Sequence, residues 1–147
     1  DMHLGRTKKC LSEKYKEISK EIMIKLDRGN TGINVKGMYS KEDKEMIFVT
    51  GQIAQDANGN VVCEDIEGQT EYVFNCIQKI LNEANSSLDD VVKTQTFLTD
   101  INDFSKVSPI RNKYFANSKP VSTLVEVSSL VKKGCKIEIE VIAIKDK

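Results

Sequence analysis

Histidine and tryptophan are nearly missing from this sequence of 147 residues, which has one histidine, His3, and no tryptophan. Nucleophilic catalysis of the Ser-His-Asp or Cys-His type needs a histidine base next to the nucleophile. A histidine-based metal site needs imidazole ligands grouped in space. Because His3 is the only imidazole and stands near the start of the chain, the sequence argues against both kinds of site.

Closely spaced cysteines are missing as well. The four cysteines, Cys10, Cys63, Cys76 and Cys135, stand far apart, and no two of them form a CxxC motif. Zinc sites and redox-active dithiols are usually recognised by such pairs. We therefore interpret the four as reduced thiols, and the sequence predicts no metal and no other cofactor.

An excess of one charge and long apolar runs are also lacking. The 22 lysines and arginines balance 22 aspartates and glutamates, so the formal net charge is zero. Binding to the phosphate backbone of nucleic acid usually requires a basic surface. The apolar runs are far shorter than the roughly 20 residues that span a bilayer. The sequence therefore predicts a cytoplasmic protein with neither nucleic acid nor a membrane as its partner.

Residues 1–20 stand out by their polar and charged composition. Within them Leu11, Tyr15 and Ile18 are spaced four and three residues apart, which is typical of a short amphipathic helix. A disordered extension fits the same segment, and a transit peptide to an organelle is a third alternative that its acidic residues argue against. We predict an N-terminal extension over 1–20 and one folded domain over 21–147, because this length is near the usual size of a single domain.

Period-2 alternation of apolar residues predicts six strands. They lie at residues 22–26, 45–55, 61–62, 90–98, 121–130 and 136–145. Residues 28–34 are predicted to form a loop, and Asn58-Gly59 is a strong signal for a hairpin turn. Gly51 interrupts the second strand, where a glycine usually marks a bulge or a close approach of neighbouring backbone. In the fourth strand, the residues expected on one face are Val92, Thr94, Thr96 and Leu98.

Helical spacing is clearest at residues 66–84, where apolar side chains share one face. They are Tyr72, Val73, Cys76, Ile77, Ile80, Leu81 and Ala84. Asp65 is the predicted N-cap, and Asn85 suits the left-handed position after the last turn. A second helix is predicted in the stretch INDFSKVSPIRNKYF, with Ser108 as its N-cap and Pro109 at its first position.

This order of elements predicts an α+β domain, in which a mixed six-stranded sheet carries both helices on one face. The other face is expected to be partly apolar, because Leu124, Ile142 and Ile144 alternate with the core positions of their strands. A contiguous exposed apolar patch usually marks association. We therefore expect the chain to oligomerise through that face.

Several stretches, in this order, resemble the RidA/YjgF family of reactive-intermediate (imine) deaminases, also called the L-PSP endoribonuclease-like family. They are IFVTGQIAQDANGNVV, DIEGQTEYVFNCIQKILNEANSSLDDVVKTQTFLTDINDF, and VEVSSL followed by KIEIEVIAI. The similarity covers about residues 20–145. It implies a chorismate-mutase-like fold of the bacillar type and a homotrimer with clefts between subunits. It also implies that the clefts take a small carboxylate or imino acid and hydrolyse 2-imino acids to 2-oxo acids and ammonia.

The resemblance gives the catalytic role to Glu138, as the glutamate of the last strand that helps to place the attacking water. The substrate-binding positions that it implies are Tyr39, Thr50, Gly51, Gln52, Ser108, Ser122 and Leu124. Among all these positions, Gly51, Gln52 and Glu138 match the family well. Ser122 replaces an arginine that grips the substrate carboxylate in active deaminases, where a planar guanidinium can bind both oxygens.

The missing arginine leaves three function hypotheses. The first is a deaminase in which another cation, such as Arg111, Lys132 or Lys133, binds the carboxylate, although each of these also suits a solvated surface. The second is a ligand-binding or interaction trimer without catalysis. The third is an endoribonuclease or translation inhibitor, against which the zero net charge argues. Glu138 also suits a simple surface position beside lysines, and Ser108 a helix cap.

Overall fold

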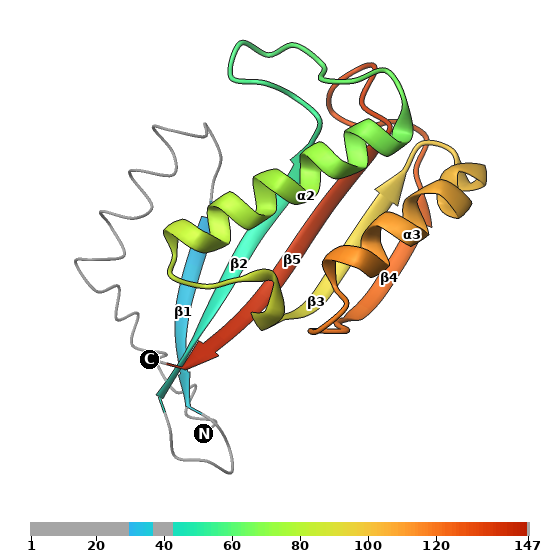
Figure 1. The fold of residues 1–147 in the computed structure, drawn as a ribbon. Coiled ribbons are helices and arrows are strands. Elements are labelled where there is room, and N and C mark those ends of the chain that lie inside the picture. The colour runs from blue at the N-terminus through green and yellow to red at the C-terminus, as the bar shows by residue number, and fades with distance from the viewer. Residues whose placement is uncertain (1–29, 37–42, 147) are drawn as a thin grey trace, which may run out of the picture.

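The computed structural model describes residues 30–36 and 43–146, which form one sheet with two helices on one face (Figure 1). The strands are β1 (Asn30–Lys36), β2 (Asp43–Ile53), β3 (Val91–Leu98), β4 (Val121–Glu126) and β5 (Ile137–Asp146). The helices are α2 (Ile66–Glu83) and α3 (Phe104–Tyr114), with short 3-10 turns η1 (Leu88–Asp90) and η2 (Ile101–Asp103). This is the predicted α+β arrangement.

The sheet has the strand order β1-β2-β5-β3-β4 and is mixed, because β3 and β4 run parallel while the other neighbours are antiparallel. The described residues contribute five strands, not the six that were predicted. The expected strand at 22–26 and the extension at 1–20 lie outside the described residues. The expected strand at 61–62 is reduced to an isolated bridge between Gln55 and Val61.

Strand β1 overturns the prediction of a loop at residues 28–34. Its sequence NTGINVK is rich in turn-forming asparagine and glycine, which explains the prediction. In the structure it pairs with β2 over its whole length, from Asn30 opposite Val49 to Lys36 opposite Asp43. Pairing with the next strand along the chain therefore outweighs the local preference of this segment.

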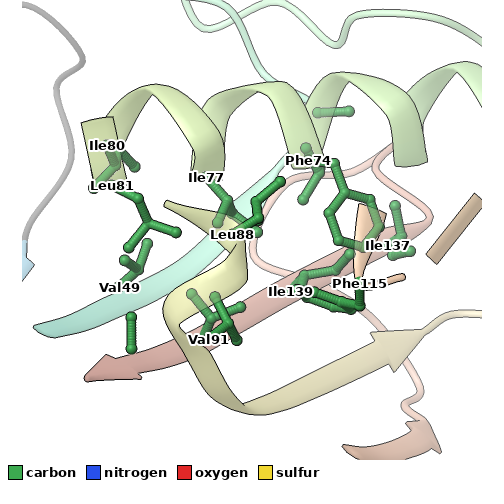
Figure 2. Packing of buried hydrophobic residues seen from close by; sticks show 14 of the residues in the cluster. Val49, Phe74, Ile77, Ile80, Leu81, Leu88, Val91, Phe115, Ile137 and Ile139 are labelled. Carbon is green, nitrogen blue, oxygen red and sulfur yellow. The ribbon is translucent and has the colours of Figure 1, made fainter. Parts of the chain in front are cut away.

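Helix α2 covers the centre of the sheet and supplies much of the core (Figure 2). Its residues Ile77, Ile80 and Leu81 are fully buried, as the predicted apolar face requires. Burial of a side chain of this size is worth about 1.5–3 kcal/mol. Both ends also agree with prediction, because the Asp65 carboxylate accepts a hydrogen bond from the Gly68 backbone at 2.6 Å and Asn85 has a φ of 52°.

Helix α3 begins earlier than predicted, at Phe104 and not after Ser108. The preceding turn η2 has its own cap, in which the Asp100 carboxylate accepts from the Asn102 backbone at 2.9 Å. The chain continues from this turn straight into the helix, so Ser108 lies in its interior and is not an N-cap. Pro109 is also inside, where it has no N–H to donate to the preceding turn.

Two bulges shape the sheet. The register of β2 against β5 shifts between Val49 and Gln52, which confirms the predicted bulge at Gly51. The register of β3 against β5 shifts between Val91 and Lys93. That second bulge was not predicted, and it puts Val91 in the core while Val92 is 42% exposed, so Val92 does not share the buried face.

The remaining local predictions can be checked directly. Gly59 has a φ of +83° in a turn closed by the Asp56 backbone N–H donating to Asn60, as expected of Asn58-Gly59. The cysteines of the described part, Cys63, Cys76 and Cys135, are free thiols. Within that part, no helix combines the length and apolar character needed to cross a membrane.

Candidate functional site

Glu138 on β5 lies directly against Gly51 on β2. A Cβ atom added at position 51 would stand 1.8 Å from Oε1 of Glu138, far inside any real contact. A side chain at position 51 would therefore have to displace the Glu138 carboxylate, whereas the sequence suggested a close approach of neighbouring backbone. The bulge brings Gly51 next to Glu138. Because glycine has no side chain, the carboxylate can lie directly over it on the sheet.

The two neighbours of Gly51 differ in environment. Thr50 is exposed, whereas Gln52 is 1% exposed and donates its side-chain amide to the Thr50 carbonyl at 2.9 Å. Gln52 is thus packed into the interior of the chain and supports the backbone beside Gly51. Thr50 instead lines a hollow of about 270 Å³ on the sheet face that the helices leave open. Other residues of this hollow are Phe48, Lys93, Gln95, Glu140 and Ile142.

A larger cavity, of about 460 Å³, lies between α3 and the β3–β4 pair. Residues that line it include Thr94, Arg111, Asn112, Phe115, Lys119 and Ser122. Arg111 donates from Nη1 to Oγ of Ser122 at 3.1 Å and from Nη2 to the Asn112 side-chain oxygen at 3.4 Å. A guanidinium therefore stands beside the serine that replaces the expected arginine. The cation is present, but α3 supplies it and not β4.

The other predicted residues of this region are placed as follows. Ser108 lies three residues before Arg111 on α3, close to the same side of the helix. Leu124 is partly buried and packs against the core. This corrects the expectation that Leu124 shares the open face with Ile142 and Ile144. Tyr39 lies outside the described residues.

The predicted residues fall into two groups on opposite faces of the sheet. Ser122 and Leu124 are in register with the buried Thr94 and Thr96 of β3, so they face the helices. Glu138 alternates with core residues of β5 such as Ile139, so it faces the other way. Arg111 and Glu138 are therefore not brought together within one chain.

A polar contact between the helices holds α3, and with it Arg111, in place. The Tyr114 hydroxyl donates to the Glu71 carboxylate of α2, and the Tyr114 ring stacks on Phe74 with centroids 4.6 Å apart. Lys113 also contacts Glu71, at 3.3 Å. Burial and the neighbouring carboxylate raise the pKa of Tyr114 to about 12. The hydrogen bond from Tyr114, with help from Lys113, holds the pKa of Glu71 below its ordinary value.

Sequence reasoning missed three polar or charged residues of the larger cavity, namely Thr94, Asn112 and Lys119. The alternation in β3 predicted only that Thr94 shares one face with Thr96 and Leu98. Its closeness to Ser122 depends on the parallel pairing of β3 with β4, which a single sequence does not reveal. Lys119 has a φ of 43° just before β4, a backbone state that no local signal predicts for a lysine.

The structure defines a class of protein, a two-layer α+β domain with candidate binding residues on both faces of its sheet. Residues 31–145 match the family model for Endoribonuclease L-PSP. The chain therefore belongs to this family, which is also the RidA/YjgF family. It is 46% identical over 113 residues to a RutC family protein of Pyrococcus abyssi, an alignment that covers 75% of this chain and 88% of that protein.

Solved structures of other members of the family have the same fold. The crystal structure of yeast Mmf1 superposes with a TM-score of 0.65 at 31% identity and covers 79% of this chain and 100% of that one. RidA from an Antarctic Psychrobacter species gives a TM-score of 0.62 at 31% identity, covering 75% of this chain and 84% of that chain. The likeness extends over the sheet and both helices, and thus over the elements that carry both groups of site residues.

Proposed function

We propose that this protein hydrolyses small 2-imino acids to 2-oxo acids and ammonia, with Arg111 binding the substrate carboxylate. The observation that carries the proposal is the hydrogen bond of 3.1 Å from Arg111 to Ser122. It places a guanidinium at the site where the family resemblance implies a strand arginine. A guanidinium has five N–H donors, so the bond to Ser122 leaves others free to bind a carboxylate.

The proposed chemistry needs one proton carrier and no cofactor. Water adds its oxygen to C2 of the imine, and Glu138 takes a proton from that water. Glu138 gives this proton to the imine nitrogen, which leaves a hydroxyl and an amino group on C2. It then carries the hydroxyl proton to the amino nitrogen, the C2–N bond breaks, and ammonia leaves as the C2–O bond becomes the carbonyl. Glu138 suits the role because its carboxylate lies over Gly51 on the partly exposed face of the sheet.

We further propose that the complete site forms between two copies of the chain in a homotrimer of the chorismate-mutase-like, bacillar type. Two observations support this. Arg111 bonds to Ser122 on the face of the sheet that the helices cover, whereas Glu138 lies on the opposite face. The open face and the β4 edge also expose apolar side chains, with Val121 69% and Val125 43% exposed, and such surfaces usually mark association.

The test is the rate of 2-iminobutanoate hydrolysis, with the imine generated in situ by an amino-acid oxidase. The wild-type protein should exceed the background rate clearly. Arg111→Gln should lower kcat/KM by about a hundredfold or more, since truncating one member of a buried charge pair costs roughly 2–5 kcal/mol. Adding Ser122→Arg to that variant should restore much of the rate, because it returns a guanidinium to the cavity from the strand.

The control is Lys133→Gln, which removes one positive charge from the loop after β4 and leaves the cavity unchanged. Its rate should match the wild type. A different set of rates would support a second candidate function, a ligand-binding trimer without catalysis. The serine at position 122, in place of an arginine, favours that function. In that case the wild-type protein would show only background hydrolysis while Ser122→Arg alone would be active.

A further inference from the structure

We infer that the cavity between α3 and the β3–β4 pair is built for a short acid with two carboxylates. This inference rests on the proposed function and names the class of substrate for it. Two cations line the cavity, Arg111 and Lys119, and none of the described residues that line it is acidic. A single carboxylate bound at Arg111 would leave the second cation without an anionic partner. A dicarboxylate would match both.

Thr94 gives independent evidence that a ligand enters this cavity. Its side chain is 1% exposed and lines the cavity, and Oγ1 has no hydrogen-bond partner within the described residues. Buried hydroxyls are nearly always paired, because an unpaired one is energetically costly. Thr96 and Ser118 also have unpaired hydroxyls, but they do not line this cavity. A bound carboxylate would supply the acceptor that Thr94 lacks.

The floor of the cavity has the groups that one carboxylate needs. Thr94 and Ser122 are register partners on the parallel strands β3 and β4, so their side chains lie on the same face of neighbouring strands. Arg111 lies over this pair through its bond to Ser122 Oγ. A carboxylate here would receive charge-assisted hydrogen bonds from the guanidinium and further bonds from the two hydroxyls.

Lys119, the second cation that lines the cavity, has an unusual backbone state. Its φ is 43°, and its backbone N–H donates to the Phe115 carbonyl at 3.0 Å just beyond α3. Glycine or asparagine adopts this left-handed state at lower energy than lysine. A lysine kept at such a position points to a function for its ammonium group, which here is binding the second carboxylate.

The size of the cavity agrees with a short acid. Its volume of about 460 Å³ is at the lower end of the range of small-molecule sites, which runs from about 300 to 1,000 Å³. Phe115 and Pro120 add apolar wall to the cavity, which suits the methylene groups of a four-carbon acid. The substrate class is therefore a 2-imino acid whose side chain ends in a carboxylate.

The test is calorimetric binding of succinate and of butanoate to the full chain. The two acids share a four-carbon skeleton and differ in the second carboxylate. Succinate should bind about fivefold more tightly, which is near the upper end for a charge pair open to water. Lys119→Gln should remove this difference, whereas Lys133→Gln, which changes net charge equally, should preserve it.

A second variant tests the floor of the cavity. Thr94→Val keeps the shape of the side chain and removes the unpaired hydroxyl. It should weaken binding of both acids by severalfold without lowering the melting temperature, because the free protein loses no hydrogen bond. A merely structural threonine would leave both affinities unchanged, and that result would overturn the role of Thr94.

The outcomes separate this inference from the proposed function. Preferential binding of succinate without imine turnover would support the dicarboxylate site and reject the hydrolase. Imine turnover with equal affinity for both acids would reject the dicarboxylate site and leave the hydrolase standing. Inorganic phosphate binding as tightly as succinate would reveal a general anion site and overturn the inference, as would failure to bind either acid.

Discussion

Arg111 of α3 donates a hydrogen bond to Ser122 of β4, over 3.1 Å between Nη1 and Oγ. The family resemblance implies a guanidinium on the strand, at the position of Ser122. In this chain the positive charge has moved to the helix that covers the strand, while the hydroxyl of Ser122 orients it. We propose that this guanidinium takes the role of the missing strand arginine, so that the cation is relocated to α3.

The relocation predicts unequal effects of two truncations. Ser122→Ala removes one neutral acceptor of Arg111, and a typical hydrogen bond is worth about 0.5–1.5 kcal/mol. It should therefore lower kcat/KM for 2-iminobutanoate by about tenfold at most. Arg111→Ala removes the cation itself and should cost far more. Steady-state rates of the two variants check this order, and equal losses would mean that Ser122 binds the substrate independently of Arg111.

Gly51 and Glu138 should show strong coupling in folding stability. Gly51→Ala forces a Cβ against Glu138 and should destabilise the fold by about 1–3 kcal/mol, the usual range for overpacking. Glu138→Ala makes room for that atom, so Gly51→Ala should cost much less in its presence. Urea unfolding of the wild type, both single variants and the double variant measures the coupling. Additive effects would show that backbone conformation, and not the carboxylate, requires the glycine.

The predictable parts of the fold are those whose signals are local. Helix α2 has a full apolar stripe, an N-cap in Asp65 and a left-handed residue in Asn85, and all three were identified from sequence. The predicted start of α3 was wrong, although the signal for it was also local. Ser108 followed by Pro109 imitates a helix start, but the turn at Ile101–Asp103 begins the helix one turn earlier.

The rest of the site depends on contacts between distant segments. The sequence predicted Gly51 as a bulge but could not show that Glu138 fills the space beside it. Arg111 was one of several candidate cations, and its bond to Ser122 needs α3 to cross β4 at one particular place. Thr94 was missed because the parallel pairing of β3 with β4 joins strands separated by a helix.

The contact between Tyr114 and Glu71 should make stability depend on pH at both extremes. The raised pKa of Tyr114 means that its contribution is complete below the ordinary tyrosine pKa of about 10 and is lost as the pH rises through about 12. The lowered pKa of Glu71 means that its contribution is complete above the ordinary glutamate pKa of about 4.3 and is lost as the pH falls through the lower folded value.

Tyr114→Phe isolates this contact. It keeps the stacking on Phe74 and removes the hydroxyl, so near neutral pH it should cost about 1 kcal/mol after allowance for the solvent exposure of the carboxylate. The difference from the wild type should shrink below pH 4 and above pH 10, as followed by urea unfolding across that range. A difference that stays constant with pH would mean that the hydroxyl acts through packing alone.

The placement of Arg111 and Glu138 on opposite faces predicts that two inactive variants can repair each other. If one chain supplies Arg111 and a neighbour supplies Glu138, a mixed trimer of Arg111→Gln and Glu138→Gln chains contains some sites with both residues intact. Random assembly from equal amounts leaves about one quarter of the sites intact. We therefore expect about one quarter of the wild-type rate after the two variants are unfolded together in urea and refolded, with each variant refolded alone as the control. Recovery no greater than in these controls would show that no site combines Arg111 of one chain with Glu138 of another. The proposed site between two subunits would then be wrong.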